Sequence, residues 1–199
     1  MKAKSIPKLD GHGHTHTSSY IRCLNDSTPL IGIEPSAILG FRDEYPDLVD
    51  HNLVDQSKAV AKNVFLFEEW FMREVGEGKI TKSSFTSAQR KIKIHGHCHQ
   101  KSLASMLPVK LALSFPEHYE ARLIPSGCCG MAGSFGYEQE HYDLSKKVGE
   151  LVLFKAVRAA DEEILIAASG TSCRHQIKDG TGKRALHSIE VLFNALKDN

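Results

Sequence analysis

The stretch Ile92-Lys-Ile-His-Gly-His-Cys-His-Gln100 joins a short apolar run to a cysteine that closely follows it. The run Ile92–His95 has the length and the β-branched residues of a strand. Three similar runs occur along the chain, separated by helical patterns: Leu30–Glu34, Ala121–Ile124 and Glu163–Ala167. Alternating strands and helices predict parallel strands joined by right-handed crossovers. We therefore expect an α/β fold with an open, mainly parallel sheet of about four strands and helices on both faces.

The spacing of apolar residues predicts the helices between these strands. The longest pattern lies in Leu53–Val75, where Val60, Val64, Phe67 and Phe71 recur at helical intervals. Residues 1–28 are polar and show neither helical nor strand periodicity, so we expect a flexible leader before a single α/β domain of residues 29–199. Further helices are predicted in Lys101–Ser114, broken at Pro108, in Tyr137–Ala160, and in His187–Leu196.

The composition favours one soluble domain. The chain has 199 residues, of which 41% are hydrophobic and 25% charged, and this length suffices to bury one core. Its formal net charge of +1 gives no reason to expect nucleic acid as a partner. No apolar run approaches the roughly 20 residues of a membrane span, and the N-terminus lacks a secretory apolar region. We expect a cytoplasmic protein whose odd number of cysteines serves metal binding or catalysis.

Four of the five cysteines lie just after predicted strands. Cys98 follows the run at Ile92, Cys128 and Cys129 follow Ala121–Ile124, and Cys173 follows Glu163–Ala167. Loops after the carboxyl ends of parallel strands line the usual ligand crevice of such sheets, so these thiols are expected to converge.

Converging thiols would repel one another as thiolates unless a cation held them. The pattern therefore favours a metal ion or an iron-sulfur cluster over buried neutral cysteines or a redox-active Cys128-Cys129 pair. His97 and His99 flank Cys98 and, with His95, are further candidate metal ligands. No residue stands out as catalytic.

Several segments carry a resemblance to a known family. The cysteine-containing segments His95–Gln100, Pro125–Gly136 and Ser169–Ile177, together with Gly32–Ser36 and Phe41–Pro46, resemble the cysteine-rich CCG domain of iron-sulfur oxidoreductases. The resemblance covers about residues 29–199. It is especially close to the C-terminal part of FAD-linked oxidase/iron-sulfur fusion proteins of the D-2-hydroxy-acid dehydrogenase type.

The resemblance implies a set of ligands. Cys98, Cys128, Cys129 and Cys173 would ligate a [4Fe-4S] cluster, which is non-cubane in some members, or zinc. The chain departs from the family pattern at two positions. Gly170 stands where a late CxxC motif has its first cysteine, and Ala37 stands where some members have a further cysteine.

The resemblance also implies a function. The chain would be the electron-transfer module of a flavin-linked dehydrogenase acting on lactate, 2-hydroxyglutarate or glycolate. FAD would reside on a flavoprotein partner chain or on a longer parent, because the sequence has no flavin-binding region. We therefore expect an oxidoreductase component that is not a complete dehydrogenase on its own. The alternative is a zinc-stabilised structural or docking domain without redox activity.

Overall fold

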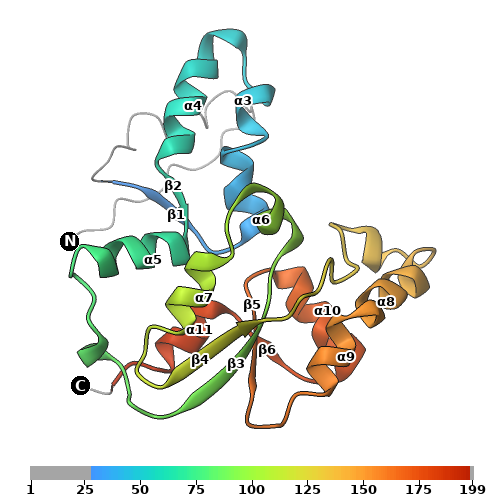
Figure 1. Cartoon of the computed structure of the whole chain (residues 1–199). Coiled ribbons are helices and arrows are strands. Elements are labelled where there is room, and N and C mark those ends of the chain that lie inside the picture. Colours follow the sequence, from blue (N-terminus) through green and yellow to red (C-terminus); the bar gives the residue numbers. More distant parts are fainter. Residues whose placement is uncertain (1–27, 198–199) are drawn as a thin grey trace.

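A computed structural model describes residues 28–197, and its centre is a four-stranded parallel sheet (Figure 1). The strands lie in the order β4, β3, β5, β6, so β3 and β5 are interior. Ile92 of β3 pairs with Ala121 of β4 and with Leu165 of β5. The predicted α/β class with a mainly parallel sheet is confirmed. The strands comprise Arg90–His95 (β3), Tyr119–Leu123 (β4), Leu165–Ala168 (β5) and Ala185–Leu186 (β6).

Helices cover both faces of the main sheet (Figure 1). Successive residues of a strand point to opposite faces. Accordingly, Ala167 packs with α5, α7 and α11, whereas its neighbours Ile166 and Ala168 pack in a second cluster with α9 and α10. The first group comprises α5 (Phe67–Gly76), α7 (Leu107–Leu113) and α11 (Ser188–Phe193), and the second comprises α9 (Leu153–Arg158) and α10 (Thr171–Thr181). The helix α8 (Tyr142–Leu151) contacts α9 and α10.

The first predicted strand does not join the main sheet. It forms β1 (Leu30–Gly32), which pairs in parallel with β2 (Val64–Leu66) in a separate two-stranded sheet. A small core of its own supports this sheet, with Ile38 and Leu39 buried against Val64. The connecting elements are α2 (Pro35–Ile38), η1 (Leu39–Phe41), α3 (Tyr45–Leu48), η2 (His51–Leu53) and α4 (Val54–Lys62).

The single helix expected over Leu53–Val75 was therefore wrong, because β2 divides that stretch into α4 and α5. Arg42 donates two hydrogen bonds to the backbone oxygen of Val64 and forms an ion pair with Glu69. Glu69 in turn accepts a hydrogen bond from the Leu66 backbone N–H at 2.9 Å, which caps the start of α5. The Arg42 contacts come from a residue distant in sequence, and they override the helical period of the apolar residues.

The other predicted helices form in shorter pieces. The stretch Lys101–Ser114 contains the end of α6 (Cys98–Leu103) and then α7, where Pro108 lies in the first turn, a position at which proline is tolerated. The stretch Tyr137–Ala160 is divided at Val152, whose φ of −139° and ψ of −50° separate α8 from α9. Two further short helices are η3 (Lys82–Ser84) and η4 (Phe135–Tyr137).

Between Thr28 and Lys197, no helix is both long and apolar enough to cross a membrane. The predicted flexible leader lies outside the described residues, apart from Thr28.

Candidate metal centre

Three loops at the carboxyl end of the main sheet bring the four cysteines together. Cys98 begins α6 directly after β3, Cys128 and Cys129 lie in the loop after β4, and Cys173 lies in the first turn of α10 after β5. Cys98 is hydrogen-bonded to Cys128, Cys128 to Cys129, and Cys129 to Cys173. The four thiols therefore form one continuous row.

The row of thiols runs from the surface into the core. Cys98 is exposed, Cys128 is half-buried, and the Cys129 and Cys173 side chains are 3% and 2% exposed. The two inner cysteines pack against apolar residues such as Phe154 and Ile177. One end of the row is thus open to a partner or solvent, and the other is shielded from water.

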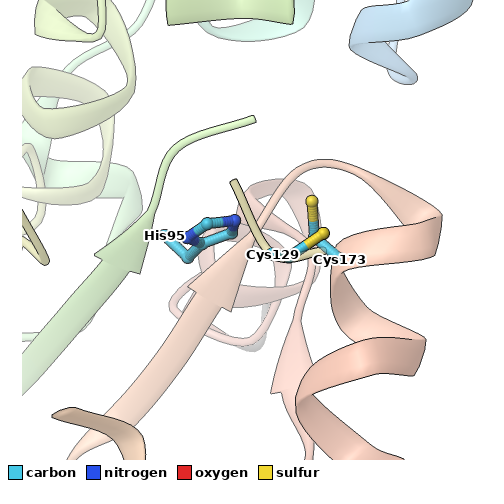
Figure 2. Close-up of side chains that lie close together, drawn as sticks. All are labelled: His95, Cys129 and Cys173. Atoms are coloured by element: carbon cyan, nitrogen blue, oxygen red, sulfur yellow. The ribbon is translucent and has the colours of Figure 1, made fainter. Parts of the chain in front are cut away.

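His95, the last residue of β3, lies beside the inner end of this row (Figure 2). One of its ring nitrogens and the Sγ atoms of Cys129 and Cys173 all lie within 4.8 Å of one another. The His95 side chain is 1% exposed, and its Nδ1 is 2.8 Å from the Ser126 hydroxyl. Burial, with a smaller contribution from the Lys101 charge, lowers the pKa of His95 to about 4, so the imidazole is neutral at physiological pH.

The loop before the cysteine pair is held by Lys101. Its ammonium group donates hydrogen bonds to the backbone oxygens of Ser126, at 2.7 Å, and Gly127, at 2.6 Å. Lys101 belongs to α6, which Cys98 begins, so this contact ties the Cys98 loop to the Cys128-Cys129 loop.

The glycine after the pair is required by close packing as well as by conformation. Gly130 has a φ of +104°, and a Cβ atom there would lie 2.2 Å from the backbone oxygen of Ser145 in α8. The Gly130 N–H donates a 3.3 Å hydrogen bond to Cys128 Sγ. Only glycine allows this positive φ together with so close a contact to the α8 backbone. Gly130 therefore positions the cysteine pair against α8.

The loop after β5 is anchored by two carboxylates. The buried Glu68 of α5 accepts hydrogen bonds from the hydroxyls of Ser169, at 2.9 Å, and Ser188. Glu34, which follows β1, accepts a 2.8 Å hydrogen bond from the backbone N–H of Thr171, the first residue of α10. The segment after β1 thus reaches the same edge as the cysteine loops, although β1 belongs to the other sheet.

The structure places the two histidines that flank Cys98 differently from His95. His97 is 7% exposed, and a Cβ atom at Gly170 would lie 2.4 Å from its Cδ2. Burial lowers the pKa of His97, although Glu34 opposes this shift. His99 is half-buried on α6. Neither residue belongs to the compact donor group of His95, Cys129 and Cys173, and Cys98 and Cys128 also lie outside that group. Sequence reasoning named His95 only alongside His97 and His99, because its burial and its unpaired ring nitrogen depend on neighbouring strands.

Three of the thiols, those of Cys98, Cys128 and Cys129, have raised pKa values and favour the neutral form when no cation is bound. Burial, and then the neighbouring Cys128, raise the pKa of Cys98. The hydrogen bond to Cys129, followed by burial, raises the pKa of Cys128 strongly. For Cys129, the hydrogen bond from Cys128 lowers the pKa, but the bond to Cys173 and burial together raise it to about 12. A soft cation would favour the thiolate forms instead, since coordination deprotonates thiols. The donor set of thiols and a neutral imidazole suits zinc or iron.

These raised pKa values predict slow alkylation of the metal-free protein. A thiol reacts as its thiolate, so a group whose pKa is raised becomes reactive only at higher pH. At pH 8 we expect Cys129 to react with iodoacetamide at least a hundredfold more slowly than cysteine in a short peptide, and the exposed Cys98 to react before it. Timed alkylation of reduced, metal-free protein with peptide mass mapping measures both rates. A midpoint of Cys129 reactivity near the ordinary thiol pKa of about 8.5 would contradict the prediction.

Comparison with known proteins relates the chain to parts of dehydrogenases. It is 28% identical over 169 residues to a component of the anaerobic glycerol-3-phosphate dehydrogenase of Escherichia coli K12, a match that covers 84% of this chain and 40% of that protein. It is 30% identical over 173 residues to the D-2-hydroxyglutarate dehydrogenase of the same strain, covering 85% of this chain and 16% of the relative. The corresponding enzyme of Haemophilus influenzae is 25% identical over 174 residues, with the same two shares.

The chain thus spans well under half the length of these relatives. No family model matches the chain, and no solved structure is significantly similar to it. The comparisons relate the chain to an oxidoreductase domain. The structure adds a compact group of cysteine and histidine donors that could hold a metal ion.

Proposed function

We propose that this chain is a CCG-type domain that binds an iron-sulfur cluster through Cys98, Cys128, Cys129 and Cys173. The observation that carries the proposal is the continuous row of these four thiols at the carboxyl end of the parallel sheet. Thiolates are the usual ligands of such clusters, and backbone N–H groups such as that of Gly130 commonly donate to their sulfurs. A [4Fe-4S] cluster, in cubane or non-cubane form, suits four thiolates.

The proposed role is electron transfer within a flavin-linked D-2-hydroxy-acid dehydrogenase. The relatives are dehydrogenases or a dehydrogenase component by name, which supports a redox role. When bound, the cluster supplies one-electron chemistry, while FAD on a flavoprotein partner or parent oxidises the substrate. The protein shields the inner ligands Cys129 and Cys173 from water and leaves the Cys98 end accessible. A flavoprotein would approach at Cys98, in the reducing cytoplasm where these thiols stay unpaired.

Anaerobic reconstitution tests this proposal. The purified chain is incubated with ferrous iron, sulfide and a thiol reductant, desalted, and analysed for iron, sulfide and zinc per chain. We expect about four irons and four sulfides per chain, a brown colour, and bleaching on reduction by photoreduced flavin. A colourless protein that retains neither iron nor sulfide would overturn the electron-transfer proposal.

A zinc-stabilised docking domain is the second candidate. It is favoured by the compactness of His95, Cys129 and Cys173, whose donor atoms lie within 4.8 Å of one another, a size suited to one ion. Closed zinc sites contribute folding energy and need no redox activity. This candidate predicts one tightly held zinc per chain as isolated and a fall in melting temperature on chelation. An unchanged melting temperature after complete zinc removal would exclude it.

A further inference from the structure

His95 is the last residue of β3, so its ring lies at the sheet edge from which the cysteine loops leave. In the sheet, His95 pairs with Ala168, the last residue of β5. The chain continues from Ala168 through Ser169 into α10 and reaches Cys173 in the first turn of that helix. Strand register therefore fixes the imidazole beside the inner end of the thiol row.

The two ring nitrogens of His95 have different surroundings. Nδ1 is 2.8 Å from the hydroxyl of Ser126, two residues before the cysteine pair. Nε2 is fully buried and has no hydrogen-bond partner anywhere in residues 28–197. Buried polar atoms in proteins are almost always paired, so an unpaired one requires an explanation.

That explanation lies in the neighbouring sulfurs. A ring nitrogen of His95 shares a space less than 4.8 Å across with the Sγ atoms of Cys129 and Cys173 (Figure 2). If Nδ1–H donates to Ser126, the lone pair on Nε2 is free to bind a cation. A histidine ligand of a metal typically uses one nitrogen for the metal while the other is held by a hydrogen bond, and the Ser126 contact has this form.

We propose that His95 is a nitrogen ligand of the metal centre, oriented by Ser126, and that it joins the thiolates of Cys129 and Cys173 at the buried end of the site. The inference rests on the proposed metal binding and extends it from an all-cysteine centre to a mixed one. It assigns Ser126 as a positioning residue, since its hydroxyl contacts the imidazole and not the ion. With the four thiols, His95 gives five donors in a site where Gly170 contributes none.

Cobalt(II) is a direct probe of this assignment, because its absorption spectrum reports the ratio of sulfur to nitrogen ligands in zinc-like sites. The reduced, metal-free chain is titrated with cobalt(II) under anaerobic conditions. Wild type should bind one cobalt with sulfur-to-cobalt charge-transfer bands and d–d bands of a mixed sulfur and nitrogen site. His95→Ala should weaken binding at least tenfold and shift the d–d bands. Ser126→Ala should weaken binding about tenfold and leave the band positions unchanged.

Isotope labelling tests the same assignment on the iron-loaded protein. Chain labelled with ¹⁵N-histidine is reconstituted, and the paramagnetic state of the centre is examined by pulsed electron paramagnetic resonance. We expect a strong coupling from one coordinated nitrogen, absent in His95→Ala and retained in His99→Gln, the matched histidine variant on α6. Circular dichroism and the melting temperature of the metal-free variants verify that each one folds.

The outcomes separate this inference from the proposed function. Failure of the wild-type chain to bind iron, sulfide or cobalt overturns the metal-binding proposal itself. Full metal loading with weak or absent nitrogen coupling, and with His95→Ala as tight as wild type, overturns only the assignment of His95. A weak coupling of that kind would indicate a hydrogen bond from the imidazole to a thiolate.

Discussion

Cys129→Ala is expected to abolish metal loading, with less than a tenth of the wild-type iron or zinc retained per chain. Cys129 is the central member of the thiol row, since it is hydrogen-bonded to both Cys128 and Cys173 and also belongs to the compact group with His95. Its removal divides the row into an exposed part and a buried part.

The same variant should lose most of the stability that the metal supplies. At a free metal concentration a thousand times the dissociation constant, binding stabilises a folded protein by about 4 kcal/mol. For a chain of this size, that corresponds to a rise of roughly 8–16 °C in melting temperature on loading. We expect this rise in wild type and almost none in Cys129→Ala, as measured by thermal scans of matched loaded and metal-free samples.

Two controls make the result specific. Cys23→Ala removes the fifth cysteine, which lies outside the described residues, and should load like wild type. The metal-free form of Cys129→Ala should melt within a few degrees of metal-free wild type, because the lost buried group is small. If Cys129→Ala loaded fully and gained the same thermal stability, the thiol row would not be the metal site.

The overall architecture was predictable because the main-sheet strands have a clear local sequence pattern. The apolar runs that became β3, β4 and β5 carry β-branched residues and follow stretches of helical spacing. The carboxyl ends of parallel strands share one edge, so the location of each cysteine after a strand was enough to predict convergence. The sheet does bring Cys98, the pair and Cys173 into one row.

The strand β2 and its pairing with β1 were not predictable from local pattern. β1 and β2 each have three residues, and β2 lies inside a stretch whose apolar residues keep a helical period. It is Arg42, more than 20 residues away, that binds the Val64 backbone oxygen and the Glu69 carboxylate. Such pairing is set by tertiary contacts, which propensity and periodicity do not encode.

The role of Gly170 also needed the structure. A glycine where the family pattern has a cysteine is compatible with a vacant ligand position or with a backbone that needs a positive φ. The structure gives it a φ of −73° and a ψ of 133°, an extended conformation open to any residue. The constraint is instead steric, since a Cβ atom would lie 2.4 Å from Cδ2 of His97 and 3.2 Å from Sγ of Cys173. The neighbouring imidazole excludes a side chain there.

A double-mutant cycle between positions 170 and 97 should therefore show strong coupling. Gly170→Cys alone forces the His97 ring to move in a buried site, and overpacking of this kind costs about 1–3 kcal/mol. In His97→Ala the obstructing ring is gone, so Gly170→Cys should cost little in that background. The coupling energy should be about 1–3 kcal/mol, measured by urea denaturation of the metal-free single and double variants.

Gly170→Ala is the matched control, because it adds the same Cβ atom without a thiol. It should show the same destabilisation and the same rescue by His97→Ala, but leave the paramagnetic spectrum of the reconstituted centre unchanged. Gly170→Cys with His97→Ala should instead change that spectrum, because its Cβ lies beside Cys173 and its sulfur can reach the inner end of the row. Equal spectra for the cysteine and alanine variants would mean that position 170 serves only to accommodate His97. Equal stabilities for Gly170→Ala and wild type would mean that the imidazole moves aside at no cost, and the steric argument would fail.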